Sequence, residues 1–172
     1  MKNVAVLGTG GSVAEFSPEG YDWTIGVNDI WKIFQTKDIV CLDYPSAFKP
    51  DRLKVIQSSK PNKFFSQMVI WDIRPDFEQI KIKPGYPDRV CSLDMFQGFE
   101  KSYCSPFVAA QIAFRYYAAQ EIHLYGVDLI NHPHLDSKLC AKIKVHFQNL
   151  QAALKAKGSK IVVHGQGILQ NL

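Results

Sequence analysis

The chain has 172 residues, of which 47% are hydrophobic and 21% are charged, and its formal net charge is +4. These values are ordinary for one globular domain and exclude a disordered chain. No apolar run approaches the ~20 residues that cross a bilayer, so we expect no membrane span. The lysines are scattered, which is typical of a solvated surface and predicts no nucleic-acid partner. The alternative role of a mildly basic surface is attraction of anionic ligands.

The first residues, Met1 to Val4, lead directly into an apolar run. A signal peptide needs a longer apolar core and a small-residue cleavage site, so we expect a cytoplasmic protein. The cysteines form no C-x-x-C pair, which indicates neither a zinc knuckle nor a redox motif and favours free thiols. They are Cys41, Cys91, Cys104 and Cys140.

Short apolar runs recur along the chain and are typical of strands buried on both faces of a parallel sheet. We expect such strands at 4–7, 24–27, 38–42, 121–126 and 160–163, with a further one within 64–71.

Helical patterns separate the apolar runs. Ser105-Pro106 predicts a helix start, because serine is a good N-cap and proline suits the first helical position. Apolar residues on one face predict an amphipathic helix over 137–157, which Gly158 ends in the left-handed conformation. A short helix is expected at 30–34.

Strands that alternate with helices indicate crossover connections and a mostly parallel sheet. We therefore expect a single Rossmann-like α/β domain over residues 1–172, with three layers and helices on both faces of the sheet. The middle segment, about 57–104, contains several of the nine prolines. We expect it to be an irregular, reduced lid or an insertion.

A glycine-rich loop, Gly8-Thr9-Gly10-Gly11-Ser12, follows the first predicted strand directly. Glycines let a backbone approach a ligand closely, and N–H groups at the start of the following helix point at an anion. The loop lacks the third glycine of G-x-G-x-x-G and the lysine of a Walker loop. We predict that these five residues bind a nucleotide; the alternative is a turn without a ligand.

Four polar residues stand where the predicted strands end or a helix begins. Asn28 offers a donor and an acceptor to a base or sugar, and Asp43 is placed to meet a ribose hydroxyl or a metal. Ser105 is placed to contact an anion, and Asp128 follows a strand and a glycine. We predict all four at the nucleotide site, although capping or turn formation is the alternative for Asn28, Asp43 and Ser105.

The histidines supply candidates for a general base. His132 and His134 form an H-x-H pair, but no further His or Cys cluster supports a metal site, so a surface loop is favoured and no metal is expected. His146, on the flank of the amphipathic helix, and His164, after the last strand, are candidate bases. For either of them the alternative is a structural or exposed histidine.

Several of these stretches resemble a known family. Val6 to Ser12 is similar to the G-x-G-P-S opening of family 42 bacterial sialyltransferases, and Val27-Asn28 resembles their second-strand asparagine. Ser105 to Leu129 resembles that family's serine, apolar helix and "EIYLxGxDF" strand. Hydroxymethylpterin diphosphokinase-like proteins share these features. Thr9, Gly11 and Pro106 stand where the sialyltransferases usually have asparagine, proline and glycine.

The resemblance implies a Rossmann-like sheet that binds a nucleotide, which in sialyltransferases is CMP joined to a sugar acid. It places the loop and Asn28 on the nucleotide, and Ser105 near the phosphate or sugar. The expected function is that of a nucleotide-sugar-dependent glycosyltransferase, which transfers to a small or glycan acceptor by direct displacement and needs no cofactor. At most one of His132, His134 and His146 would be its base.

Two alternatives stay open. One is diphosphoryl transfer from ATP, which needs Mg²⁺ and makes Asp43 or Asp128 a candidate ligand. The other is a non-catalytic module that binds a nucleotide or sugar.

Overall fold

The computed structural model describes residues 1–44, 46, 48, 50–130 and 135–172. Its centre is a seven-stranded, all-parallel sheet in the order β5-β4-β3-β2-β1-β6-β7. The strands are β1 (Asn3–Leu7), β2 (Trp23–Val27), β3 (Asp38–Val40), β4 (Lys63–Ser66), β5 (Phe77–Gln79), β6 (Glu121–Tyr125) and β7 (Lys160–Val163). The predicted α/β, Rossmann-like class is confirmed.

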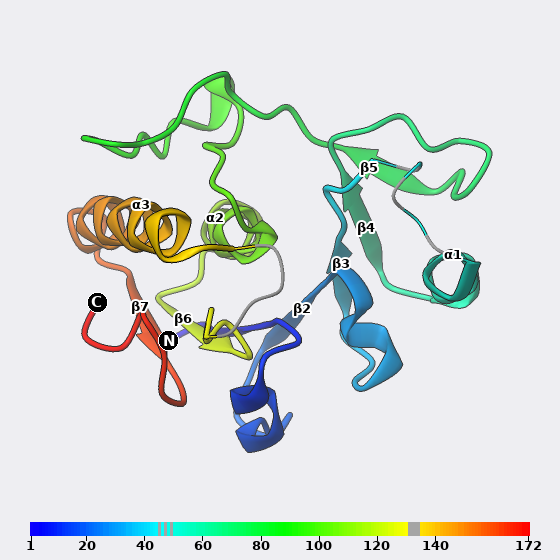
Figure 1. Cartoon of the computed structure of the whole chain (residues 1–172), viewed down its shortest axis with the longest axis horizontal. Coiled ribbons are helices and arrows are strands. Elements are labelled where there is room, and N and C mark those ends of the chain that lie inside the picture. Colours follow the sequence, from blue (N-terminus) through cyan, green and yellow to red (C-terminus); the bar gives the residue numbers. More distant parts are fainter. Residues whose placement is uncertain (45, 47, 49, 131–134) are drawn as a thin grey trace.

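Helices cover both faces of this sheet (Figure 1). They are α1 (Pro50–Ser58), α2 (Ser105–Tyr117) and α3 (Ser137–Lys155), with the short 3-10 helices η1 (Gly11–Glu15), η2 (Asn28–Lys32) and η4 (Met95–Gln97). In β1, Val4 and Val6 face the core beneath α2 and α3, whereas Ala5 and Leu7 pack on the opposite face with residues of η1 and η2. Because successive side chains of a strand point to opposite faces, the fully apolar strands predicted from the sequence are buried twice.

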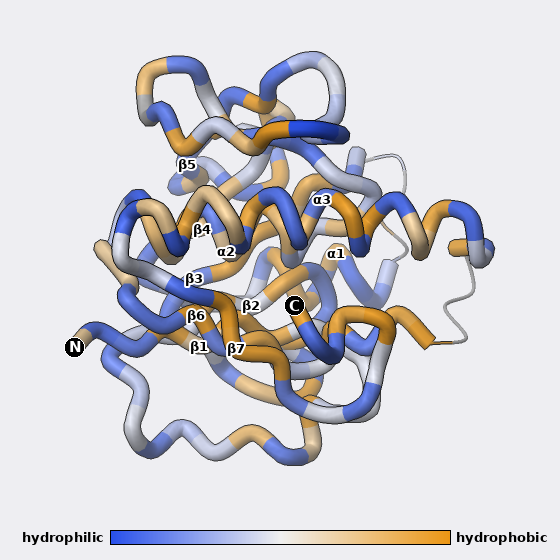
Figure 2. The backbone as a smooth tube through the Cα atoms, turned by 90° about the vertical axis from the view of Figure 1, so that its left-hand side faces the viewer, coloured by the Kyte–Doolittle hydropathy of each residue, from blue (hydrophilic) through white to orange (hydrophobic). Residues whose placement is uncertain are grey.

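The two long helices fill one face for different reasons. All residues of α2 from Phe107 to Ala113 are buried. In α3, Figure 2 shows hydrophobic and hydrophilic residues alternating, and only one face is buried. The side chain of Asp136 caps α3 by accepting from the Leu139 N–H at 2.8 Å. Gly158 follows the helix with φ 78°, which confirms its predicted left-handed conformation.

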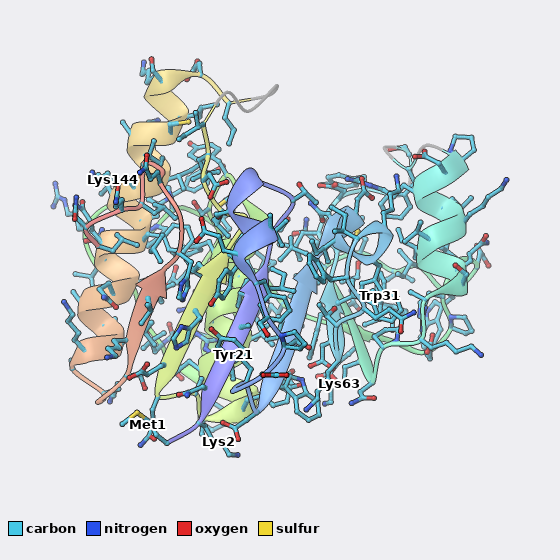
Figure 3. All side chains as sticks on the ribbon, turned by 90° about the horizontal axis from the view of Figure 1, so that it is seen from below. Met1, Lys2, Tyr21, Trp31, Lys63 and Lys144 are labelled. Atoms are coloured by element: carbon cyan, nitrogen blue, oxygen red, sulfur yellow. The ribbon has the colours of Figure 1, made fainter. Side chains whose placement is uncertain are left out.

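The chain order creates a switch point between β1 and β6. From β1 the chain passes outward through β2, β3, β4 and β5, and it later returns to place β6 and β7 on the other side of β1. Figure 3 looks onto the face that carries Tyr21 and Trp31, with the amino ends of the strands near Met1 and Lys2 at the bottom. In open parallel sheets, ligands bind beyond the carboxyl ends of the strands at such a switch point.

The middle segment differs from the prediction. Residues 57–104 were expected to form a lid or insertion, but β4 and β5 within it complete one side of the sheet, and β4 ends at Ser66. The preceding helix α1 was not predicted, because Ile56 is its only buried residue among those described and its sequence carries little apolar periodicity. The remainder, from residue 80 to 104, is mostly irregular and passes over α2 and α3 (Figure 1).

Across the described residues, no helix combines the length and apolar character that a bilayer crossing requires.

Candidate functional site

A crevice of about 790 Å³ opens at the carboxyl ends of the central strands. This volume is within the range of small-molecule sites in proteins. Its walls come from the glycine loop, the end of β2, Asp43, Arg52, the start of α2, the segment after β6 and Gln166. All of the residues predicted to bind a nucleotide line the crevice, except Ser12. That these residues bind a nucleotide stays a prediction.

The glycine loop spends most of its N–H groups on the protein itself. Gly8 donates to the Tyr125 carbonyl at 2.8 Å, and Gly10 donates to the Gly126 carbonyl at 2.9 Å. Within the described part of the chain, the N–H groups of Thr9 and Gly11 have no such acceptor. These two N–H groups are therefore the ones available to an anion in the crevice.

The carboxylate of Asp128, which follows β6, lies at the first turn of η1. Its carboxylate accepts from the Ser12 N–H at 2.9 Å and also from the Ser12 hydroxyl, while that hydroxyl accepts from the Gly126 N–H at 2.8 Å. Ser12 is buried by these contacts. The anion at this turn is thus a side chain of the protein, and the pair ties the loop after β6 to the loop after β1.

The glycines of these two loops have a packing role. A Cβ on Gly10 would lie 2.7 Å from Asp128 Oδ2 and 2.8 Å from the Gly126 carbonyl oxygen, and a Cβ on Gly8 would lie 2.4 Å from the same oxygen. A Cβ on Gly11 meets only Asp128 Oδ2, at an ordinary 3.8 Å. Gly8 and Gly10 are required for close backbone contact, whereas the space beside Gly11 is open.

Asn28 in the crevice wall combines a left-handed backbone, which Leu129 of the same wall shares, with an unpartnered amide oxygen. It follows β2 with φ 53°, a left-handed conformation that non-glycine residues rarely adopt. Its amide oxygen is buried and has no hydrogen-bond partner among the described residues. Strained backbone and unsatisfied buried polar atoms both cluster at functional sites, and here one residue combines them.

Arg52 joins two carboxylates across the crevice floor. Its Nε donates to Asp29 at 2.7 Å and its Nη1 donates to Asp43 at 2.5 Å. Together with Asp128, the described lining therefore holds three carboxylates and one guanidinium. The excess of negative charge means that an anionic ligand must be met by N–H donors or arrive with a cation.

The start of α2 also faces the crevice. Cys104, and not Ser105 as predicted, is the N-cap, and it makes no side-chain capping bond. The helix therefore begins one residue earlier than the serine-cap pattern indicates. Burial raises the pKa of the Cys104 thiol to about 12, so this residue is a protonated thiol in the wall and not a nucleophile. Pro106 has no N–H, and the Phe107 N–H donates to the Cys104 carbonyl at 3.4 Å, so the Ser105 N–H is the donor at this helix start that is suited to an anion.

The histidines are dispersed. His146 is fully buried on α3, where its ring nitrogens contact Ser102 and Asp88, and it does not line the crevice. His164 pairs with His123 on the face of the sheet opposite α2 and α3. His132 and His134 lie outside the described residues. Which histidine acts as a base remains a prediction.

Several residues of the crevice were not predicted from the sequence, among them Arg52, Tyr103 and Gln166. Arg52 is carried by α1, whose Pro50-Asp51 start was a readable helix signal, with proline at the first position and an acid in the first turn. Tyr103 and Gln166 lie on irregular segments, where spacing gives no signal.

Comparison with protein-family models, with curated proteins and with solved structures gave no match. Within the described ranges, no group of three or more His, Cys, Asp or Glu side chains is arranged to hold a metal ion. The site must therefore be interpreted from its own geometry.

Proposed function

We propose that this protein is a nucleotide-sugar-dependent glycosyltransferase whose donor, of the CMP-sugar type, binds in the 790 Å³ crevice. The observation that carries the proposal is Asn28, which is held in a strained conformation with an unpartnered amide oxygen at the carboxyl end of β2. A nucleoside supplies the donor that this oxygen lacks, and satisfying a buried acceptor is favourable by about 1–3 kcal/mol.

The charge of the crevice favours a donor of this kind. A nucleoside monophosphate ester carries one negative charge on its phosphate, which is the smallest charge a nucleotide donor brings to a wall with three carboxylates. The N–H groups of Thr9 and Gly11 and the Ser105 N–H at the start of α2 are donors that need no counter-ion.

The same donors suit the chemistry of transfer. An acceptor oxygen forms a bond to the anomeric carbon while the bond from that carbon to the phosphate oxygen breaks, and the electron pair leaves with the phosphate. Negative charge grows on the leaving group, so fixed N–H dipoles stabilise the transition state more than the ground state.

One observation favours a second candidate, a Mg²⁺-dependent transferase that uses ATP. The carboxylates Asp29, Asp43 and Asp128 give the crevice a negative lining that attracts a divalent cation. Mg²⁺ in phosphoryl-transfer sites commonly uses one or two carboxylates together with the phosphates of the substrate, so a larger ligand cluster is not needed. Under this alternative, Mg²⁺ would be essential for ATP binding.

Titration calorimetry separates the candidates. We expect CMP to bind without Mg²⁺ and more tightly than UDP, GDP or ATP; binding of ATP only with Mg²⁺ would replace the proposal by its alternative. Absence of binding by every nucleotide at millimolar concentration would end both. Nucleotide binding without turnover of the corresponding nucleotide sugar would indicate a binding module.

A matched pair of variants locates the site. Gly11→Val extends into open space and is expected to weaken nucleotide binding by about tenfold or more while the protein stays folded. Gly10→Val would collide with Gly126 and Asp128 and is expected to lower the free energy of unfolding by about 3 kcal/mol. Unchanged binding by folded Gly11→Val would contradict the placement of the nucleotide.

A further inference from the structure

A second cavity, of about 330 Å³, adjoins the crevice. The two share four lining residues: Asp43, Tyr103, Cys104 and Ser105. A ligand in the smaller cavity therefore meets a ligand in the crevice across this common wall. The smaller cavity also has residues that the crevice lacks, among them Lys101 and Ser102.

Ser102 is the visible end of a chain of three polar side chains. Its hydroxyl lies 2.9 Å from His146 Nδ1, and His146 Nε2 lies 3.1 Å from Asp88 Oδ1. A carboxylate only accepts hydrogen bonds, so Nε2 carries the ring proton and Nδ1 accepts from the serine. This is the arrangement of a hydroxyl, a base and an orienting carboxylate.

The burial of the three residues gives the chain a direction. The His146 side chain is fully buried, whereas the Asp88 side chain is 71% exposed. The imidazole stacks near Tyr86 and Tyr103, with ring centroids 5.6 and 5.9 Å away, and it lines neither cavity. A proton can reach it from the cavity through Ser102, and the exposed Asp88 carboxylate stabilises the charged ring.

The charges of the smaller cavity select the ligand. Lys101 is its only lining lysine, and no carboxylate among the described residues lies within ion-pair distance of the Lys101 ammonium. Asp43, the one carboxylate of the lining, is paired with Arg52. Asp43 shares that guanidinium with Asp29, whereas the Lys101 ammonium lies over the Tyr86 ring, 4.6 Å from its centroid, so Lys101 is the group of this lining that favours an anion.

We propose that the 330 Å³ cavity is the subsite for the second substrate, a small alcohol or sugar that carries one phosphate or carboxylate group. Lys101 binds the anionic group, and Ser102 receives the hydrogen bond of the reacting hydroxyl. The role of this ligand as a second substrate rests on the proposed transferase function. In that reaction Ser102 is a catalytic residue, and His146 and Asp88 are positioning residues that act through it.

The proton of the acceptor hydroxyl passes along the chain from Ser102 to His146. The acceptor hydroxyl gives its proton to Ser102 Oγ as its oxygen bonds to the anomeric carbon, and Ser102 gives its own proton to His146 Nδ1. The bond from the anomeric carbon to the phosphate oxygen breaks, and the electron pair leaves with the phosphate. The imidazolium is stabilised by Asp88 and, once the product has left, returns the Nδ1 proton through Ser102 to solvent in the cavity, which restores the Nε2–H tautomer.

Calorimetry with three probes tests the subsite: sn-glycerol 3-phosphate, glycerate and the neutral control glycerol. We expect both anions to bind and glycerol not to. Lys101→Gln should weaken glycerol 3-phosphate binding about tenfold, and Ser102→Ala about fivefold. The matched control is Lys142→Gln, because the Lys101 ammonium lies over the Tyr86 ring and the Lys142 ammonium over the Tyr103 ring, but Lys142 lines neither cavity. Equal effects of the two lysine variants, or equal binding of glycerol, would overturn the subsite.

Kinetics test the proton path. With CMP-linked sialic acid as donor and glycerol 3-phosphate as acceptor, Asp88→Asn should lower kcat of transfer about tenfold, with KM unchanged. Asp94→Asn, an exposed carboxylate of the same segment that caps η4, is the control and should change nothing. A wild-type rate in Asp88→Asn would overturn the path.

The two proposals fail separately. If no nucleotide binds but glycerol 3-phosphate binds in a Lys101-dependent way, the glycosyltransferase function falls and the anion subsite stands. If CMP binds but none of the three probes does, the subsite falls and the nucleotide site stands.

Discussion

The carboxylate of Asp38 and the amide oxygen of Asn28 are buried polar groups at opposite ends of the parallel strands, and they differ in their hydrogen-bond partners. Asp38 begins β3 with no exposed surface, and its carboxylate accepts from Trp23 Nε1 at 2.7 Å, from the Lys63 N–H at 3.0 Å and from the Tyr117 hydroxyl. Asn28 ends β2, and its buried amide oxygen accepts from no described residue. The carboxylate at the amino end of β3 is fully paired, whereas the amide oxygen at the carboxyl end of β2 lacks a partner.

The difference separates structural polarity from functional polarity. Burial raises the pKa of Asp38, and the hydrogen bonds from Tyr117, Trp23 and Lys63 act against that increase by stabilising the charged form. A carboxylate with this many donors joins strands β2, β3 and β4 to helix α2. An amide held in a strained conformation without a partner contributes nothing comparable to stability, so its place in the fold needs another reason.

The largest expected effect on stability comes from removing the Asp38 carboxylate. Asp38→Ala leaves the Trp23, Tyr117 and Lys63 donors unpaired, so we expect the free energy of unfolding to fall by about 3 kcal/mol or more. Urea unfolding measures the loss. Nucleotide affinity of the folded fraction should not change, because the crevice is at the other end of the strands. A loss below 1 kcal/mol would mean that the Asp38 cluster is not structural.

The strands and the crevice could be predicted from the sequence for one physical reason. Strands such as Val4-Ala5-Val6-Leu7 are buried on both faces, which leaves an unbroken apolar run, and polar residues at their ends must meet at one edge of a parallel sheet. The position of Asn28 and Asp128 in the crevice follows from that rule.

Tertiary contacts set the features that the sequence could not predict. Asp128 reads as a ligand-binding acid, but its carboxylate satisfies Ser12 across 116 positions of sequence. His146 reads as an exposed flank of a helix and is buried because the segment around Asp88 folds over it. The helix that carries Arg52 has a readable start, but the role of Arg52 comes from the two carboxylates that contact it, and the sequence does not show that contact.

A smaller effect is expected from relieving the strained end. Asn28→Gly removes the amide and adopts the left-handed conformation without strain, so we expect it to weaken CMP binding about tenfold and to raise the free energy of unfolding by about 0.5 kcal/mol. If replacing a residue makes the protein more stable but weakens ligand binding, the original residue serves function and not stability. Calorimetry and urea unfolding measure the two quantities.

Ala118→Gly is the matched control for that variant. Ala118 ends α2 with φ 51° and lines neither cavity. We expect a gain in stability of about 1 kcal/mol, since glycine is the preferred residue at a left-handed helix end, and unchanged CMP binding. If both variants leave binding unchanged, Asn28 is a strained turn residue without a ligand.

The smallest expected effect concerns a third polar cluster, which has partners but is weakened by acid. His123 Nδ1 and His164 Nε2 lie 2.9 Å apart, and the His164 ring stacks on Tyr125 with a centroid separation of 3.9 Å. Burial lowers the pKa of both histidines from the usual 6.5, although Glu121 beside His123 acts in the opposite direction. These two histidines therefore bind protons near pH 6.5 in the unfolded chain but only at a lower pH in the folded protein.

This sign predicts that stability is greatest above pH 6.5 and falls as the pH decreases toward the lowered pKa values. His164→Phe keeps the stacking on Tyr125 but removes one of the two titrating rings. Its Tm should fall less than that of the wild-type protein between pH 7.5 and 5.5 when both are followed by circular dichroism. Parallel Tm curves for the two proteins would show that the His123–His164 pair does not contribute to acid sensitivity. The pair would then be a structural polar cluster like the one around Asp38.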